Sequence, residues 1–225
     1  ARQLLAVDSV ATMLPNTAEH VLLLHAIWYC GASAAPLNTR ASEEELQARL
    51  CHLQPKMFIT RGRKTAQEAQ VVDLAAVPDF SAMDADAPSA ADENDGAVDA
   101  GYRGLCSILF TSGSSGSPRA VAHDWKQHRA SAEGSAENLP LDRDDIWQCV
   151  IPLYHIGGLA ILTRSLFAGS AVLLHEGFSP VEIRDALLHR NVTITSLVPT
   201  MLHRLFEGDE KLRGAGLPQL RAVLL

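Results

Sequence analysis

Apolar and polar positions along the chain follow helical spacing in some segments and extended spacing in others. In PNTAEHVLLLHAIWYCGA, apolar residues fill the turns after Asn16 and Glu19, which have capping-box spacing, and Gly31 offers a left-handed stop. Ser42 and Glu45 repeat the capping box before a second apolar helix, which a proline ends ahead of KMFIT, a run typical of a buried strand. The start of the chain therefore predicts helices that alternate with buried strands.

The alternation becomes more regular in the second half of the chain. Gly169 offers a stop for one helix, and Ser179, Pro180 and Glu182 form a strong start for another. Strands separated by helices imply right-handed crossovers, so we expect the α/β class, with layered, mostly parallel sheets flanked by helices. The expected elements are, in order, strands SILFT and RAVAHD, helix DWKQHRASAEGSAEN, strand IWQCVI, turn PLYHIGG, helix LAILTRSLF, strand AVLLH, helix VEIRDALLHRN, strand VTITSLV, helix PTMLHRLF and strand LRAVLL.

An acidic segment separates the two patterned regions. It carries seven acidic residues between Asp79 and Ala100 and no Lys or Arg, so it accounts for the whole formal charge of −7. Its composition is typical of a solvated connector. We therefore expect a first α/β part over 1–78, an acidic connector over 79–101 and an α/β subdomain over 102–225. The rest of the chain is balanced in charge, which argues against nucleic acid as a partner.

Composition limits the class of protein further. At 225 residues, 47% of them hydrophobic, the chain is long enough to bury a sizeable core. It lacks a run of about eighteen apolar residues that would span a bilayer, and ARQLLAVDSV does not resemble a secretory signal. The four cysteines form no C-x-x-C pair, so we expect buried, reduced thiols, no metal site and a cytoplasmic location. These cysteines are Cys30, Cys51, Cys106 and Cys149.

The stretch FTSGSSGSPRAVAH has the order expected of a phosphate-binding loop. Its two glycines permit positive φ, so successive backbone N–H groups can turn toward one point, and four hydroxyl side chains add donors there. An arginine just beyond the loop's proline can reach a pair of phosphate oxygens. We expect a polyphosphate at this point. The candidate binding residues are Thr111, Ser112, Gly113, Ser114, Ser115, Gly116 and Arg119.

Spacing excludes two familiar loops. A Walker loop has glycines five apart followed at once by Lys and Ser or Thr, and it opens a helix; here the glycines are three apart and a strand is expected to follow. A nucleophile elbow requires G-x-S-x-G, but Ser117 stands where its second glycine would be. A flexible polar hairpin loop is the alternative that composition alone leaves open.

TSGSSGSPRAV resembles the phosphate-loop signature of the adenylate-forming superfamily, T-S-G-[ST]-T-G-x-P-K-x-V, shared by acyl-CoA synthetases, luciferases and peptide-synthetase adenylation domains. Ser115 replaces the threonine and Arg119 the lysine, so a hydroxyl and a positive charge are kept, although a guanidinium does not mimic the point charge of an ammonium group. IPLYHIGGL is similar to the superfamily's acyl-pocket motif, and LPNTAEHVLLLHAIWYCGASAAPLNTRASEEELQARL to its amino-terminal subdomain. The resemblance therefore implies part of the large amino-terminal domain of the acyl-adenylate synthetase fold. LNTR, DDIWQCVIPLYHIGGLAILTRSLFAGSAVLLH and SLVPTMLHRL look most similar to the o-succinylbenzoate:CoA ligases of menaquinone biosynthesis.

This resemblance implies a two-step reaction. A substrate carboxylate attacks the α-phosphorus of ATP, pyrophosphate leaves, and the thiol of coenzyme A captures the acyl adenylate. Two anions must be neutralised and aligned, and the resemblance implies that the loop holds the β- and γ-phosphates with Mg²⁺. The expected substrates and cofactors are ATP, Mg²⁺, coenzyme A and a small carboxylic acid. No membrane span or nucleic acid is expected, and a homo-oligomer stays open.

Four residues outside the loop are candidates for binding the acid. His155 lies in PLYHIGG, where Gly157 and Gly158 let backbone approach a ligand at a helix start, a position suited to anions. A histidine beside apolar residues is more often structural, but the resemblance implies that His155 lines the acyl pocket next to the reacting carboxylate, as the candidate catalytic residue. Thr200 follows a parallel strand and is a further candidate for substrate binding, with a role in starting its helix as the alternative.

Arg40 and Arg164 are weaker candidates for binding a second carboxylate, and a surface or structural role is the alternative for both.

The superfamily's later motifs for adenine, ribose and the catalytic lysine do not occur between Ala1 and Leu225, so we expect a piece of the enzyme that is inactive alone. The hypothesis is an ATP-dependent acid:CoA ligase for o-succinylbenzoate. A CoA ligase for another aryl or fatty acid and a non-catalytic phosphate-binding relative are the alternatives.

Overall fold

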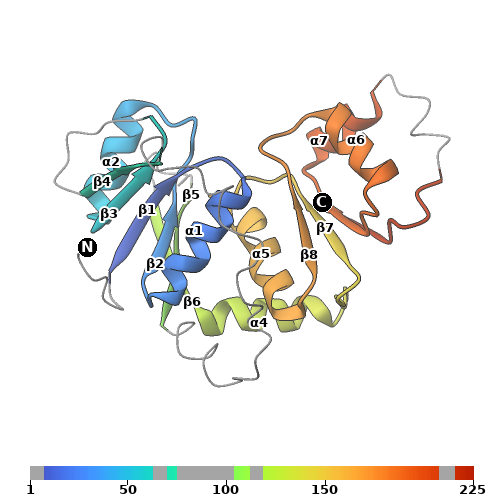
Figure 1. Cartoon of the computed structure of the whole chain (residues 1–225), viewed down its shortest axis with the longest axis horizontal. Helices are drawn as coiled ribbons and strands as arrows, with labels where there is room; N and C mark the ends of the chain where they lie inside the picture. Colours follow the sequence, from blue (N-terminus) through green and yellow to red (C-terminus); the bar gives the residue numbers. More distant parts are fainter. Residues whose placement is uncertain (1–7, 63–69, 75–103, 112–118, 208–215) are drawn as a thin grey trace, which may run out of the picture. The chain divides into compact units, whose positions relative to one another are not determined.

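The chain divides into two compact units (Figure 1). The computed structural model describes residues 8–62, 70–74, 104–111, 119–207 and 216–225. The first unit comprises Ala1–Leu14 with Ala18–Trp125, and the second comprises Pro15–Thr17 with Lys126–Leu225. The acidic connector lies outside the described residues. The strands that follow residue 104 pair into the sheet of the first unit, which therefore extends beyond residue 78.

A six-stranded sheet forms the first unit, in the order β4-β3-β1-β2-β5-β6. All neighbouring strands pair in parallel except β5 and β6, so the mostly parallel α/β sheet expected from the sequence is confirmed. The elements are β1 (Ser9–Met13), α1 (Ala18–Tyr29), β2 (Ser33–Pro36), α2 (Glu43–Leu53), β3 (Met57–Thr60), β4 (Gln70–Asp73), β5 (Leu105–Thr111) and β6 (Arg119–Asp124).

Three strands of this sheet were not predicted. β2 reads SAAP, and its small residues and proline give little strand signal, yet all four of its residues are buried between β1 and β5. β1 and the edge strand β4 were missed as well. By contrast β3, β5 and β6 confirm the strands expected in KMFIT, SILFT and RAVAHD.

The helix boundaries of the first unit support one capping box and overturn the other. Ser42 accepts a hydrogen bond on its side chain from the backbone N–H of Glu45 at 3.1 Å, as predicted. The prediction of a capping box between Asn16 and Glu19 is wrong. The helix α1 begins at Ala18, and the Asn16 side chain forms hydrogen bonds with a distant loop of the second unit instead. Gly31 has a φ of 74° and ends α1 as expected.

The second unit contains a four-stranded, fully parallel sheet in the order β10-β9-β7-β8. Its helices and strands confirm the order predicted for the second half of the chain, and Gly169 ends α5 with a φ of 71°. These elements are α4 (Trp125–Ala136), β7 (Ile146–Cys149), α5 (Ile156–Ala168), β8 (Ala171–Leu174), α6 (Pro180–His189), β9 (Ile194–Ser196), α7 (Pro199–Phe206) and β10 (Ala222–Leu224).

A buried polar group lies inside this second sheet. Gln148 on β7 is fully buried, accepts a hydrogen bond from Thr195 Oγ1 at 2.9 Å and donates to the Ile183 carbonyl at 3.3 Å. Its amide nitrogen also lies 3.0 Å from His175 Nε2, and burial lowers the pKa of His175. A neutral imidazole can accept this hydrogen bond, so β7, β9 and α6 are joined without a buried charge.

The prediction that the four cysteines are buried is confirmed for two of them. Cys106 and Cys149 are buried and free, and burial raises the pKa of the Cys149 thiol to about 12. Cys30 and Cys51 are free but exposed, because one follows the last residue of α1 and the other lies on the outer face of α2. Among the described residues no helix is long and apolar enough to cross a membrane.

Candidate functional site

The predicted phosphate loop joins β5 to β6. Residues 112–118, which include Ser112, Gly113, Ser114, Ser115 and Gly116, lie outside the described residues. Thr111 and Arg119, which flank them, form the last pair of the antiparallel register. Both are exposed, and Thr111 Oγ1 donates to the Arg119 carbonyl at 3.5 Å, so the two ends of the loop are held together at the end of a hairpin.

The other predicted residues lie at the carboxyl edge of the second sheet. All four strands run parallel, so the segments that follow them emerge at one edge. β7 and β9 are neighbours, with Cys149 opposite Ser196, and they lead respectively to the loop with His155 and to the helix with Thr200. The topology thus places residues that are 45 positions apart in the sequence at adjacent strand ends, where ligands bind in such sheets.

His155 is the N-cap residue of α5. Its backbone is extended, with φ −104° and ψ 143°, and its side chain makes no capping hydrogen bond. Its ring is exposed and lies against the ring of Tyr154 at a centroid distance of 4.5 Å. The imidazole therefore projects at the start of a helix, where N–H groups and the helix dipole favour an anion.

Gly157 and Gly158 lie inside the first turn of α5, which begins at Ile156, three residues earlier than predicted. A Cβ atom on Gly158 would come within 2.3 Å of the Pro152 carbonyl oxygen and 2.5 Å of the Ile151 carbonyl oxygen. On Gly157 the nearest atom, of the Ile151 side chain, would lie at an ordinary 3.6 Å. The backbone that approaches Gly158 closely is therefore that of the preceding loop, and this contact fixes where the helix begins.

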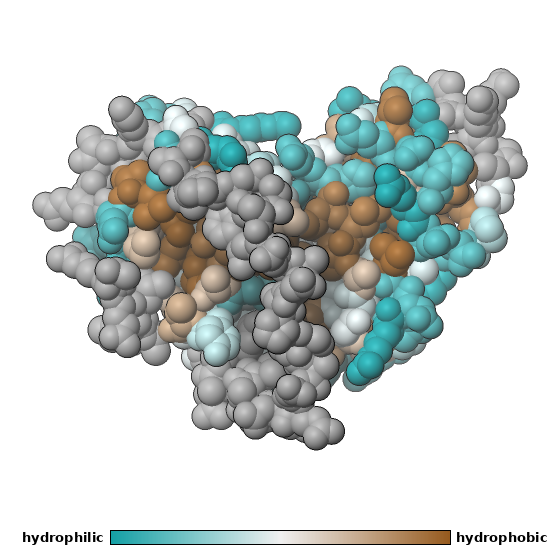
Figure 2. Space-filling view, viewed as in Figure 1, coloured by the Kyte–Doolittle hydropathy of each residue, from teal (hydrophilic) through white to brown (hydrophobic). Residues whose placement is uncertain are grey.

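Thr200 is the second residue of α7 and is exposed. Val198 is the N-cap of this helix, so Thr200 is not the capping residue but lies in the first turn, and its role in starting the helix stays an alternative. Two large apolar side chains are exposed beside these positions, with Ile156 49% and Val198 40% accessible. Figure 2 shows hydrophobic surface exposed among hydrophilic surface.

Asn16 contributes to this edge, and sequence reasoning missed it. Its side chain is 5% exposed and binds two backbone groups of the loop after β7, the Ile151 carbonyl and the Leu153 N–H, each at 3.0 Å. A polar residue before a helix is usually interpreted as a cap, and no pattern in the sequence signals a partner more than 130 residues away.

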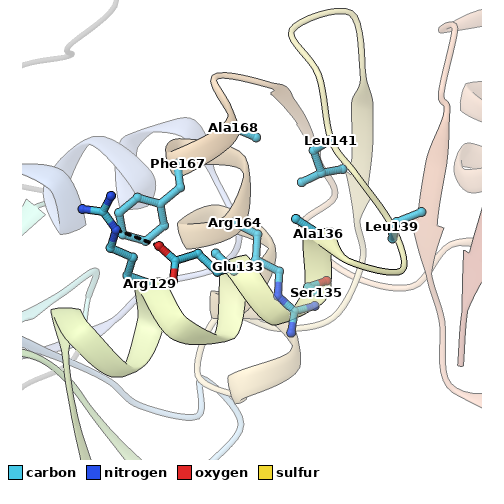
Figure 3. A pocket seen from close by; sticks show the side chains of 10 residues that line it. Arg129, Glu133, Ser135, Ala136, Leu139, Leu141, Arg164, Phe167 and Ala168 are labelled. Carbon is cyan, nitrogen blue, oxygen red and sulfur yellow. Dashed lines mark hydrogen bonds and ion pairs between the residues drawn. The ribbon is translucent and has the colours of Figure 1, made fainter.

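The two weaker arginine candidates belong to different units, Arg164 to the second and Arg40 to the first. Arg164 is nine residues beyond His155 on α5, about 13 Å along the helix axis. It lines a cavity of about 260 Å³ between α4 and α5, where Figure 3 shows Arg129 paired with Glu133 and the ring of Phe167 nearby. Arg164 Nη2 donates to Ser131 Oγ at 3.2 Å, and burial lowers the pKa of its guanidinium. Arg40 is exposed on the first unit.

No group of three or more His, Cys, Asp or Glu side chains is placed to hold a metal ion within the described part of the chain. The hydroxyl and guanidinium at the ends of the β5–β6 loop are instead donors of the kind that bind phosphate oxygens. Mg²⁺ often reaches such sites with the phosphates of its substrate and few protein ligands.

Known proteins match the chain along almost its whole length. It is 34% identical, over 97% of its residues, to a 2-succinylbenzoate–CoA ligase of Bacillus cereus, and 31% identical to one of Bacillus licheniformis, also over 97% of its residues. It spans 43% and 44% of the lengths of these two relatives.

Solved structures give the same picture of the fold. The o-succinylbenzoate CoA synthetase of Bacillus subtilis, in complex with the acyl-adenylate intermediate OSB-AMP, superposes with a TM-score of 0.78 at 27% identity, covering 96% of this chain and 55% of that one. The amino-terminal domain of FACL13 from Mycobacterium tuberculosis shares the fold, with a TM-score of 0.78 at 21% identity over 96% of this chain and 56% of that one. The model of the AMP-binding enzyme family matches residues 2–225. The chain therefore belongs to the AMP-binding enzyme family.

Proposed function

We propose that this chain supplies the phosphate loop and part of the acid-binding site of an ATP-dependent acid:CoA ligase whose acid is o-succinylbenzoate. The observation that carries the proposal is the similarity to 2-succinylbenzoate–CoA ligases, which extends over 97% of the chain and includes the loop and the segment around His155. The proposed reaction belongs to menaquinone biosynthesis in the cytoplasm.

The loop that joins Thr111 to Arg119 would bind the triphosphate of ATP. The hairpin pairing of these two residues supports the proposal, because it holds both ends of the intervening loop and so limits the entropy lost on binding. The Arg119 guanidinium would donate to phosphate oxygens, which favours the charge that develops on the departing pyrophosphate. Mg²⁺ bound with the triphosphate would neutralise further negative charge there.

The carboxyl edge of the second sheet would bind the acid. The exposed imidazole of His155 and the amino-terminal end of α5 would orient the reacting carboxylate toward the α-phosphorus. The carboxylate oxygen would then form the P–O bond as the bond to pyrophosphate breaks. The thiol of coenzyme A would attack the adenylate's carbonyl carbon, releasing AMP and the thiol proton. Gly157 and Thr200 would line the space for the acyl group, and the buried Gly158 would support it by letting the preceding loop pack on α5. The apolar surface of Ile156 and Val198 suits an aromatic ring.

The substrate is tested by measuring CoA thioester formation by the full-length protein from o-succinylbenzoate, benzoate and octanoate. We expect o-succinylbenzoate to react fastest, because a site that pairs a second carboxylate discriminates strongly against acids that lack it. Preference for a monoacid would favour the ligase for another acid. No ATP-dependent pyrophosphate release with any acid would overturn both ligase proposals and favour a non-catalytic relative.

The loop is tested by ATP–pyrophosphate exchange in two variants. Gly113→Val should slow exchange by forbidding a positive φ, and Arg119→Ala by removing a charge-assisted contact. Arg190→Ala changes an exposed arginine at the end of α6 and serves as the control. Exchange at the parental rate in both loop variants would contradict the proposed role.

A further inference from the structure

The Asn16 side chain forms a two-point bridge to the loop that leads to His155. Asn16 Nδ2 donates to the Ile151 carbonyl and Oδ1 accepts from the Leu153 N–H, both at 3.0 Å. All three residues belong to the second unit. The side chain is almost fully buried, so neither bond is exchanged readily for water.

The primary amide of Asn16 satisfies both partners at once. The Ile151 carbonyl requires a donor and the Leu153 N–H requires an acceptor, so the orientation of the amide follows from the backbone groups that it meets. A carboxylate of the same shape would keep the acceptor but would place a second acceptor against the Ile151 carbonyl. Alanine would leave both backbone groups without this partner.

The same stretch of loop is restricted from its other side. The Ile151 and Pro152 carbonyl oxygens lie within 2.5 Å of the position that a Cβ of Gly158 would take, so the loop packs directly on the first turn of α5. The His155 N–H donates to the Pro152 carbonyl at 3.0 Å, and the His155 carbonyl accepts from the N–H groups of Gly158 and Leu159. The backbone of His155 is thus tied to a loop that is held between Asn16 and the helix.

From this geometry we infer that Asn16 is a positioning residue for His155. It acts by holding residues 151–153, and through them the N-cap of α5, in the place where His155 meets the acid. This inference rests on the proposed ligase function. Loss of the bridge lets the loop shift, and misplacement of a group by about 1 Å can cost a hundredfold in rate even when the change is far from the chemistry.

The test is a double-mutant cycle between Asn16 and His155 in the full-length protein, with o-succinylbenzoate as the acid. Asn16→Ala should lower kcat/KM for the acid by about tenfold to a hundredfold, and the isosteric Asn16→Asp should be impaired to a similar degree. KM for ATP should change little in both. In the His155→Ala background, Asn16→Ala should lower kcat/KM by no more than about twofold, because the residue that it positions is gone.

Two controls separate positioning from loss of folded protein. Asn138→Ala alters an exposed asparagine of the same unit and should leave the kinetics unchanged. Thr193→Val weakens the second unit at the opposite edge of its sheet and should lower the melting temperature without raising KM for the acid. Additive losses in the cycle, or parental kinetics of Asn16→Asp, would overturn the inference. A full-length protein with no adenylation activity would instead refute the proposed function.

Discussion

Arg221 donates two hydrogen bonds to the carboxylate of Asp145, from Nε to Oδ1 at 2.8 Å and from Nη2 to Oδ2 at 2.6 Å. Thr193 Oγ1 also donates to Asp145 Oδ1, at 2.7 Å. These residues directly precede β7, β9 and β10, so the carboxylate joins the amino ends of three adjacent parallel strands. The candidate site lies at the other end of the same strands, which separates this network from the proposed chemistry.

We predict that Arg221→Met destabilises the protein without altering the site. Asp145 is buried, so the variant leaves a carboxylate with fewer partners, while the partial exposure of Arg221 moderates the loss. The expected decrease in the free energy of unfolding is about 2–4 kcal/mol. Chemical denaturation of the full-length protein measures it, with Arg190→Met as the exposed control. A decrease equal to that of the control would show that the pair contributes little.

Asp145 should also make stability depend on pH in the acid range. The hydrogen bond from Arg221 holds the pKa of the Asp145 carboxyl well below its usual range, with further hydrogen bonds from Thr193 and the Asp142 backbone acting in the same direction against desolvation by burial. Its contribution is therefore fully present above the unfolded-state pKa of about 3.9 and is lost as the pH falls below that value toward the folded-state pKa.

The measurement is the slope of unfolding free energy against pH, compared between the parent and Asp145→Asn. Because the amide does not titrate, the variant should start less stable and should lose less stability as the pH decreases from about 4. Parallel curves for the two proteins would show that this carboxyl does not carry the acid dependence.

Gly158 and Gly157 form a matched pair for a test of the loop packing. Gly158→Ala would place a methyl group 2.3 Å from the Pro152 carbonyl oxygen, so the loop or the helix must move, and we expect a loss of stability of about 2 kcal/mol or more. Gly157→Ala meets only an ordinary contact, and alanine favours helix over glycine by about 1 kcal/mol. Melting temperatures distinguish the two, and equal values would refute the close packing at Gly158.

The four cysteines should differ in reactivity. Cys106 and Cys149 are buried, and burial is the largest cause that raises the pKa of each thiol, so the native protein should protect them from alkylation at neutral pH. Cys30 and Cys51 are exposed and should be labelled within the same interval. Mass spectrometry of peptides after a short treatment with iodoacetamide measures the difference. Equal labelling of all four would indicate that the native packing around β5 or β7 is looser than described.

Local sequence determined the elements whose signals lie within one helix or strand. Ser42 caps α2, Gly31 and Gly169 end helices at positive φ, and apolar runs form β3, β5 and β7, because each feature depends on neighbours in the chain. The phosphate loop was predicted for the same reason, since the glycines, hydroxyls and arginine of this stretch are contiguous. The α/β class followed from the alternation of these elements.

Only the tertiary structure decided which of these elements meet. The order of strands places the ends of β7 and β9 side by side, and it gives the SAAP segment a buried place between β1 and β5 that its weak strand propensity does not predict. The exposure of Cys30 and Cys51 depends on which face of the neighbouring helix is turned toward the core. Asn16 shows the limit most clearly: its local context predicts a helix cap, but a buried amide binds wherever folding brings it a donor and an acceptor, and those backbone groups lie more than 130 residues away.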